Sequence, residues 1–302
     1  MNSITKSDIR VRKLETNIQK YMAFIETVEL GSFTEAADKL KYSQSGISRM
    51  IADLEHEWNV TLLERGRYGI KITSDGLKIL PYVKRLCSEF ERMQAQVNDL
   101  RGLKTGLIRI GTFSSVATHW LPKIIKRFQE DYPGIDYELL LGDYKEIEEW
   151  IEEGRIDCGF VMLPTSGHFD CISLHKDQLM AILPMDHPFA AAEYFPVTEL
   201  VKEPFMLLEK GAKGEISGIF EKHGLEPKVH FITWDDYAIM SMVESGLGIS
   251  ILPELILKRI PYQIIAKPLD PPAYRNIGFV LRDRNSAPIV VQRFMDYLEY
   301  RD

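Results

Sequence analysis

The segment Tyr42–Glu55 reads Tyr-Ser-Gln-Ser-Gly-Ile-Ser-Arg-Met-Ile-Ala-Asp-Leu-Glu and has the pattern of an amphipathic helix. Ser43 is a typical N-cap residue, because its hydroxyl can accept a hydrogen bond from a free amide of the first turn. A buried stripe is predicted at helical spacing from Ile47, Ile51 and Leu54. The opposite face is polar, and its outward side chains are predicted to be Gln44, Ser45, Ser48 and Arg49.

A second helix is predicted just before this segment. The run Ser32-Phe33-Thr34-Glu35 has the form of a capping box, in which the Ser32 hydroxyl and the Glu35 carboxylate each satisfy an amide. Two alanines follow, which allow a close approach to the next helix, and the turn Lys41–Tyr42 is short. The pair predicts a helix-turn-helix at about residues 33–52, with its second helix shaped for a DNA major groove.

The outward side chains suit contacts with DNA. Gln44 can donate and accept at once, which matches the edge of adenine, while Arg49 can reach a guanine edge or a phosphate. Taken alone, the pattern also fits a solvated polar face on an ordinary helical bundle. The DNA contacts predicted from the two helices are Ser32, Thr34, Ser43, Gln44, Ser45, Ser48 and Arg49.

A two-stranded hairpin is predicted after these helices. The segments Thr61–Arg65 and Ile70–Thr73 flank a tip that contains Gly66 and Gly69. The tip carries the last two predicted DNA contacts, Arg65 and Arg67, and forms a wing able to touch phosphate or a minor groove. This wing favours DNA binding over the bundle interpretation.

These segments together resemble the LysR-type transcriptional regulator family in order and spacing. The matching runs are Gly31–Ala37, Ser43–Ser45, Ile47–Ser48, Leu54–Glu55, Leu62–Arg65 and Thr73–Gly76. The sequence departs from the family pattern at Gly46, Leu63 and Met50, where Ala, Phe and a polar residue are usual. Gly46 costs about 1 kcal/mol of helix stability relative to Ala. Met50 bears on which DNA sequence is preferred.

The resemblance implies a layout for the whole chain. After an N-terminal extension (1–16) come a winged helix-turn-helix domain (17–75), a linker helix (76–103) and an effector-binding domain (106–302). The last is expected to be an α/β domain of two lobes, like periplasmic binding proteins. Lobe I would hold residues 106–183 and 276–302, and lobe II residues 184–275, with crossings near Leu183–Pro184 and Arg275.

Charge is distributed unevenly along the 302 residues, whose formal net charge is −7. Residues 1–104 hold 17 Lys and Arg against 14 Asp and Glu, which is +3, and the rest hold 20 against 30, which is −10. A mildly basic end on an acidic body suits a protein that touches DNA with one end only.

Cysteine usage and hydropathy bear on the compartment. Cys87, Cys158 and Cys171 are odd in number and lack metal-ligand spacing, which argues against a disulfide framework. The sequence has no run of 18 apolar residues and no signal-peptide pattern at its start. We therefore expect a cytoplasmic protein with no membrane partner.

A long helix is predicted from Thr73 or Ser74 to about Arg101, with a kink at Pro81. Its apolar residues repeat every seven positions in two sets offset by three, namely Val83, Phe90 and Val97 with Leu86, Met93 and Leu100. A helix lying on its own domain would tolerate a less regular stripe, so the heptad predicts a homodimer. Two-fold pairing implies an operator with two half-sites. The family resemblance adds a homotetramer and contact with RNA polymerase.

Apolar strands alternate with helices after the hinge Gly102–Gly106, which predicts parallel sheets covered on both faces. The predicted strands are Leu107–Gly111, Tyr137–Leu141, Cys158–Leu163, Leu179–Leu183, Phe205–Leu208, Val229–Thr233, Ile249–Leu252, Ile264–Pro268 and Ile277–Arg282. The predicted helices are His119–Asp131, Tyr144–Glu153, Gly214–His223, Asp236–Ser245 and Pro288–Tyr300.

A small-molecule effector is expected where strands end and helices begin. Hydroxyls and amides in Thr112–Ser115 can hold a carboxylate or similar anion, although these serines can equally serve only as helix caps. The family resemblance favours the ligand. Lys210 and Lys213 follow one strand and Thr233 ends another, so the predicted effector-binding residues are Ser114, Ser115, Lys210, Lys213 and Thr233.

Motifs for catalysis or cofactors are missing. The sequence has no Walker-type loop and no Gly-x-Ser-x-Gly elbow, its seven His include no zinc-ligand pair, and Gly246-Leu247-Gly248 lacks the third Gly of a dinucleotide fingerprint. We therefore expect no cofactor, no metal and no enzymatic activity. Two alternatives to a regulator are an enzyme with an accessory DNA-binding head, and a solute-binding protein for transport.

Overall fold

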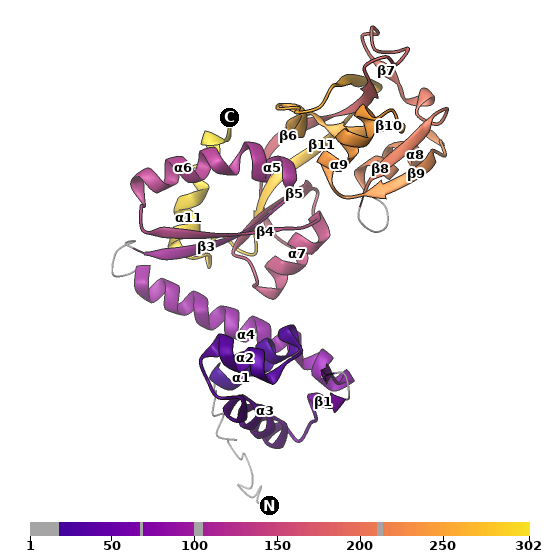
Figure 1. Cartoon of the computed structure of the whole chain (residues 1–302). Coiled ribbons are helices and arrows are strands. Elements are labelled where there is room, and N and C mark those ends of the chain that lie inside the picture. The colour runs from indigo at the N-terminus through magenta and orange to yellow at the C-terminus, as the bar shows by residue number, and fades with distance from the viewer. Residues whose placement is uncertain (1–17, 67–68, 100–104, 210–213) are drawn as a thin grey trace, which may run out of the picture. The chain divides into compact units, whose positions relative to one another are not determined.

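The computed structural model describes residues 18–66, 69–99, 105–209 and 214–302 (Figure 1). The chain separates into two compact units, Met1–Glu91 and Arg92–Asp302. We call the first the head and the second the effector unit. In the described residues, no helix combines the length and the apolar character needed to cross a membrane.

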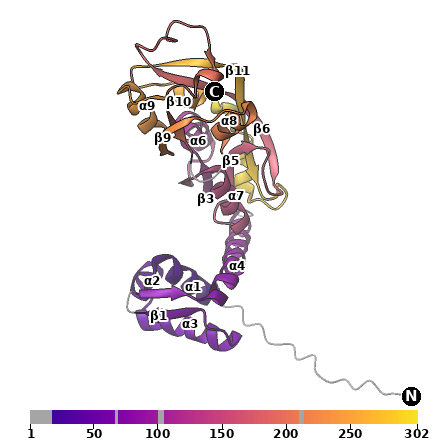
Figure 2. The same cartoon turned by 90° about the vertical axis from the view of Figure 1, so that its right-hand side faces the viewer.

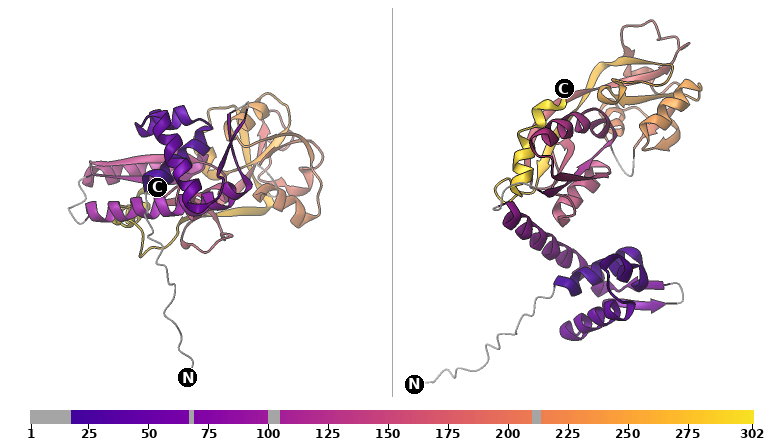
Figure 3. Two further views of the ribbon diagram at one scale, coloured as in Figure 1. Left: turned by 90° about the horizontal axis from the view of Figure 1, so that it is seen from below. Right: turned by 60° about the vertical axis from the view of Figure 1, so that its left-hand side comes forward.

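The head begins with three helices and a hairpin, which are followed by the first part of the linker helix α4 (Ser74–Asp99). The elements are α1 (Ile18–Leu30), α2 (Phe33–Leu40), α3 (Gln44–Trp58), β1 (Leu63–Gly66) and β2 (Gly69–Ile72). The strands pair antiparallel, and the hairpin extends beside α3 (Figure 3). The predicted winged helix-turn-helix is confirmed.

Local capping sets the helix boundaries in the head. Ser32 Oγ accepts a hydrogen bond from the Glu35 amide at 3.3 Å, and Ser43 Oγ accepts one from the Gly46 amide at 3.1 Å. Lys41 ends α2 in the left-handed conformation, with φ of 58°. These contacts fix the turn between α2 and α3, and the turn sets the direction of α3 relative to α2.

The core of the head lies under α3. The predicted stripe is buried there, with exposed fractions of 0%, 2% and 1% for Ile47, Ile51 and Leu54. Glu55 Oε1 accepts hydrogen bonds from the amides of Leu62 at 2.7 Å and Leu63 at 3.1 Å. The end of α3 is therefore attached to the start of the wing.

One long sheet runs through the effector unit, in the order β4-β3-β5-β11-β6-β10-β8-β9. Its strands are β3 (Gly106–Thr112), β4 (Ile135–Leu141), β5 (Cys158–Leu163), β6 (Asp170–Pro184), β8 (Pro204–Leu208), β9 (Lys228–Thr233), β10 (Ile249–Pro253) and β11 (Ile264–Leu281). The short β7 (Phe195–Pro196) pairs with β11. Figure 2 shows β6 and β11 passing through both halves of the unit.

Helices cover both faces of each half, as predicted. In lobe I, α5 (Ser114–His119), α6 (Leu121–Asp131) and α11 (Ile289–Met295) cover one face and α7 (Tyr144–Glu153) the other. In lobe II, α8 (Glu215–His223) covers one face, and α9 (Asp236–Glu244) with α10 (Glu254–Leu257) the other. Short 3-10 turns lie at Val197–Glu199 and Leu298–Arg301.

The expectation of purely parallel sheets is wrong. β3, β4 and β5 are parallel to one another, as are β8, β9 and β10, but β6 and β11 run antiparallel between these sets. The two strands predicted around Ile264–Pro268 and Ile277–Arg282 are one strand, β11. Its ladder with β6 is interrupted between Pro268 and Ala273, because prolines cannot donate to a ladder and are accommodated in a bulge.

The predicted helix boundaries also need two corrections. The helix expected at His119–Asp131 begins earlier and is divided at Trp120 into α5 and α6, where Pro122 fits the first turn of a new helix. The helix expected at Pro288–Tyr300 ends at Met295 and is followed by a 3-10 turn.

The chain crosses between the lobes at a facing pair of residues, Asp177 of β6 and Arg275 of β11. Before this point β6 contributes Leu174 to the core of lobe I, and after it Leu179 to the core of lobe II. The expected crossing at Leu183–Pro184 is therefore wrong, because the strand continues through lobe II to Pro184.

Candidate DNA-binding surface and effector cleft

The N-terminal half of α3 presents a polar face to solvent. Ser43, Gln44, Ser45 and Arg49 are exposed and Ser48 is half-buried, while the stripe behind them is buried. In α2, Thr34 is exposed and Ser32 is half-buried as the N-cap. Because the core holds the buried stripe, the polar residues of α3 are presented together on one rigid surface.

Met50, where the family pattern usually has a polar residue, has a structural role. Met50 is half-buried and packs against the core of the head, beside the buried stripe. Met50 therefore contributes to packing, which reduces its predicted influence on the DNA sequence that is preferred.

The wing carries the remaining two predicted DNA contacts, Arg65 and Arg67. Arg65 lies in β1, facing Ile70 of β2 in the ladder. Arg67 lies outside the described residues, so its place as a predicted DNA contact remains a sequence-based expectation.

The linker helix is α4 (Ser74–Asp99), and only part of its predicted heptad is free of the head. Val83 is 5% exposed and packs in the core of the head with Cys87, so we remove it from the predicted dimer contacts. Leu100 lies outside the described residues. An exposed or half-buried stripe remains at helical spacing, made of Tyr82, Leu86, Phe90, Met93 and Val97, and we call it the pairing stripe.

A cleft of about 870 Å³ lies between the two lobes of the effector unit. Lobe I lines it with the starts of α5 and α7, including Phe113 and Tyr144, and lobe II with the starts of α8 and α9, including Glu215 and Asp236. Arg275 lines it from the crossing strand. The helix starts meet here because each follows the carboxyl end of a strand.

Arg275 is the centre of a buried network and is 4% exposed. Its Nε donates to Asp177 Oδ2 at 2.9 Å, and its other two nitrogens donate to Tyr144 Oη at 2.9 Å and Ser115 Oγ at 2.8 Å. Glu215 Oε1 lies 3.6 Å from the guanidinium. This one side chain therefore joins residues of both lobes.

The two predicted serines are already engaged within the protein. Ser115 is 2% exposed and accepts from Arg275, while the Ser114 hydroxyl hydrogen-bonds the Asp236 carboxylate. The helix they begin, α5, has only six residues. These contacts argue against the predicted carboxylate site at this helix start, although both serines do line the cleft.

The other predicted effector residues have different outcomes. Lys210 and Lys213 lie outside the described residues. Thr233 ends β9, where its Oγ1 accepts from the Asp235 amide at 3.3 Å, and its neighbour Trp234 lines the cleft instead.

Sequence reasoning missed the four residues Tyr144, Glu215, Asp236 and Arg275. Three of them begin helices that follow strands, so their positions could have been read from the predicted elements. Arg275 gave no local signal, because Asp177, its ion-pair partner, is 98 residues away in sequence.

Burial shapes the acidity of the two cleft carboxyls. Burial raises the pKa of Glu215 above its usual value, although nearby Arg275 acts in the opposite direction. Burial likewise raises the pKa of Asp236, against the effect of the Ser114 hydrogen bond. The cleft therefore holds two carboxyls whose ionised forms are disfavoured by burial.

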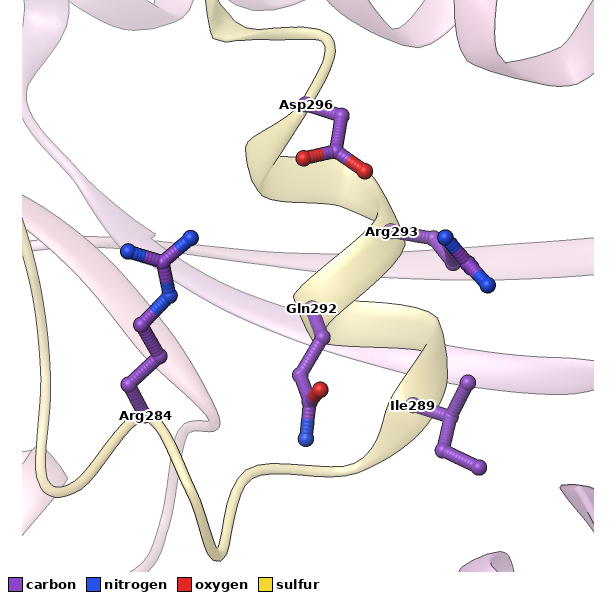
Figure 4. A pocket seen from close by; sticks show the side chains of 5 residues that line it. All are labelled: Arg284, Ile289, Gln292, Arg293 and Asp296. Carbon is purple, nitrogen blue, oxygen red and sulfur yellow. The ribbon is translucent and has the colours of Figure 1, made fainter.

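A second cavity, of about 400 Å³, lies on the surface along α11. It is lined by Arg284, Ile289, Gln292, Arg293 and Asp296, of which Gln292 donates to the Ala287 carbonyl at 2.9 Å. Figure 4 shows Arg284 and Arg293 on different sides of Gln292, without a common centre. This arrangement does not resemble a binding site.

Both parts of the chain match family models. The model described as "Bacterial regulatory helix-turn-helix protein, lysR family" matches residues 18–77, and "LysR substrate binding domain" matches residues 101–301. All eight described cleft residues named above lie within the second match: Phe113, Ser114, Ser115, Tyr144, Glu215, Trp234, Asp236 and Arg275.

Curated relatives match over most of their length. The probable HTH-type transcriptional regulator LrrA of Synechococcus elongatus is 35% identical, over 87% of this chain and 89% of LrrA. The HTH-type transcriptional regulator BenM of Acinetobacter baylyi is 31% identical, over 88% of this chain and 90% of BenM.

Solved structures share the fold. A full-length OxyR variant from Pseudomonas aeruginosa superposes with a TM-score of 0.74 at 18% identity, covering 94% of both chains. Full-length CbnR in complex with its target DNA gives 0.68 at 21% identity, covering 95% of this chain and all of CbnR. The family models matched by the head and the effector unit point to the same family as the curated relatives. The chain belongs to the LysR family of bacterial helix-turn-helix regulatory proteins.

Proposed function

We propose that the protein regulates transcription by binding double-stranded DNA through α3 and the wing. The observation that carries this proposal is the polar face of α3, with Gln44 and Arg49 exposed over a buried stripe. Gln and Arg are suited to base edges in the major groove, and the serines around them to phosphates. The family model for the head supports the same function.

The proposed DNA-binding form is a homodimer. In the described part of α4, Leu86, Met93 and Val97 are 40%, 53% and 47% exposed, which is costly for apolar side chains in water. Pairing two such helices would bury these stripes and place two heads on two half-sites. Assembly of two dimers into a tetramer and contact with RNA polymerase are further parts of the proposal.

We infer that a small molecule in the cleft controls DNA binding. The cleft lies between two lobes joined by two strands, so a ligand that contacts both lobes would favour one arrangement of them. The effector must then bind more tightly to one arrangement of the lobes than to the other, and the affinity for DNA must also differ between the two arrangements. The family model matched to this unit is a substrate-binding domain, which supports ligand binding there.

We propose that the cleft binds without catalysing a reaction. The curated relatives are named as regulators, which supports a non-enzymatic role. We also propose that the protein acts in the bacterial cytoplasm, where it would meet DNA.

The test of the proposed function is selection of DNA from a random pool by the full chain, followed by footprinting on the selected sequence. We expect two protected half-sites whose centres lie about one helical turn, or a multiple of it, apart. Gln44→Ala should weaken protection of the half-sites. The control Gln19→Ala, altered on the exposed face of α1, should leave protection unchanged. Enrichment of no sequence, or a footprint with a single half-site, would contradict the proposed dimeric regulator.

A further inference from the structure

The charge of the effector cleft indicates which class of ligand it takes, if the proposed function holds. Among the described lining residues, seven carry carboxylates and only Lys145 and Arg275 carry cations, a formal balance of −5. Lys145 Nζ lies 3.6 Å from Glu149 Oε1, so one of these cations is already paired at the rim.

The second cation, Arg275, is shared among more carboxylates than it can neutralise. Two of its nitrogens lie 2.7 Å and 2.9 Å from Asp177 Oδ2, and Asp177 is fully buried. Glu215 stands 3.6 Å away from the same guanidinium, and the Asp236 carboxylate also interacts with it. One positive charge therefore faces three acidic groups.

Neutral donors satisfy Glu215 and Asp236 without cancelling their charge. The Tyr144 hydroxyl donates to Glu215 at 3.3 Å, and the Ser114 hydroxyl bonds to Asp236. Glu215 and Asp236 repel each other, and their side chains are mostly out of water. A buried carboxylate is costly unless a cation pairs with it, and the described chain supplies too few cations here.

The walls of the cleft offer an apolar body next to this charge. Phe113, Leu141, Met162 and Leu208 line it, together with Trp234, which is 58% exposed. The Phe113 ring already lies 5.1 Å from the Arg275 guanidinium, which shows that an aromatic ring here accepts a cation.

We propose that the effector is an organic cation, an amine or related base, whose charged nitrogen sits between Glu215 and Asp236 while its apolar part contacts Trp234. This inference rests on the proposed function, since it names the ligand of the regulatory cleft. It replaces the anion expected from the sequence. The cation would supply the charge that Arg275 cannot provide to all three carboxylates.

The test uses probes that share a body and differ in charge, titrated calorimetrically into the full chain. Suitable pairs are benzylammonium with benzoate, and 1,4-diaminobutane with succinate, with benzyl alcohol as the neutral member. We expect the ammonium probes to bind and the carboxylates and the alcohol to bind at least about tenfold more weakly. Glu215→Gln and Asp236→Asn should each weaken ammonium binding about tenfold or more.

Controls separate a failure of this inference from a failure of the proposed function. Glu226→Gln removes the same charge from an exposed position of lobe II and should leave probe binding unchanged. Circular dichroism of each variant confirms that it is folded. Binding of carboxylates in preference to ammonium probes would overturn the cationic effector but keep the regulatory cleft. Binding of no probe of either charge at about 10 mM would overturn the inference and also remove support for the cleft as an effector site.

Discussion

Replacing Arg275 with Met should destabilise the effector unit strongly. The substitution keeps an unbranched side chain but removes three donated hydrogen bonds and the only cation facing Asp177 among the described network residues. Asp177 is fully buried and Glu215 is largely so, which means that water cannot replace the lost partner.

The magnitude follows from the geometry of this network. Removing one member of a buried ion pair leaves an uncompensated charge and costs about 3–5 kcal/mol. Part of this cost is recovered if Glu215 takes up a proton, so we expect a loss of about 3 kcal/mol in the free energy of unfolding. Arg275→Lys should lie between the parent and Arg275→Met, because Lys keeps the charge but cannot form the same fork of hydrogen bonds.

Urea unfolding followed by tryptophan fluorescence measures this loss. Trp120, Trp150 and Trp234 belong to the effector unit and only Trp58 to the head, so the effector unit dominates the signal. The midpoint should fall for Arg275→Met with little change in slope. Arg284→Met removes an exposed guanidinium from the same unit and should leave the midpoint unchanged.

A double variant identifies the cause. In Arg275→Met with Asp177→Asn the buried charge of Asp177 is gone, so the double variant should be more stable than the sum of the two single losses predicts. A loss below about 1 kcal/mol for Arg275→Met, or strictly additive losses, would refute the view that Arg275 holds the lobe crossing together through charge.

Three further predictions concern other parts of the molecule. Burial raises the pKa of Glu215, so protonated Glu215 contributes its full stability below the usual pKa of 4.5, and this contribution is lost as the pH rises through the folded-state pKa. Glu215→Gln should therefore make the unfolding midpoint less dependent on pH between these two pKa values. An unchanged pH profile in this variant would contradict the prediction. Met93→Asp should dissociate the dimer in sedimentation experiments, while Leu77→Asp, at an exposed site outside the pairing stripe on the same helix, should not. A Met93→Asp protein that sediments like the parent would show that the pairing stripe is not the dimer contact. Arg67→Ala should lower affinity for any DNA sequence and flatten its salt dependence, whereas a loss confined to one sequence would assign Arg67 to base recognition.

Features that depend on neighbouring residues could be predicted from the sequence. The N-cap at Ser43 and the buried stripe from Ile47 to Leu54 follow from hydrogen bonds and spacing within one helix, and the structure contains both. The helix expected at Tyr144–Glu153 has the same bounds in the structure, where Asp143 and Glu146 form a capping box and Gly154 ends the helix.

Features that depend on contacts between distant parts of the chain could not be predicted from the sequence. The heptad on α4 includes Val83, but the core of the head takes up this side chain, and no periodicity within one helix reveals which partner an apolar face will find. The sequence predicts two separate strands on either side of residue 270, because the long partner strand β6, which carries the ladder past this point, is not visible locally.

The chemistry of the cleft shows the same limit. Ser114 and Ser115 line the cleft, and the sequence predicts an anion there from the hydroxyls and amides of Thr112–Ser115 together with the family resemblance. The carboxylates on which we base the proposed cationic effector begin α8 and α9, far along the chain, and only the folded structure places them against Arg275.

The central claim is that α3 reads DNA sequence, and the most direct measurement is the ratio of specific to non-specific affinity. Fluorescence anisotropy of the full chain, on the DNA selected from a random pool and on a scrambled duplex at one salt concentration, gives this ratio. We expect the parent to prefer the selected DNA by about a thousandfold or more, and Gln44→Ala and Arg49→Ala each to reduce the preference by about 1–3 kcal/mol, with affinity for the scrambled duplex less affected for Gln44→Ala. Equal affinity of the parent for both duplexes, or an undiminished preference in both variants, would contradict the claim.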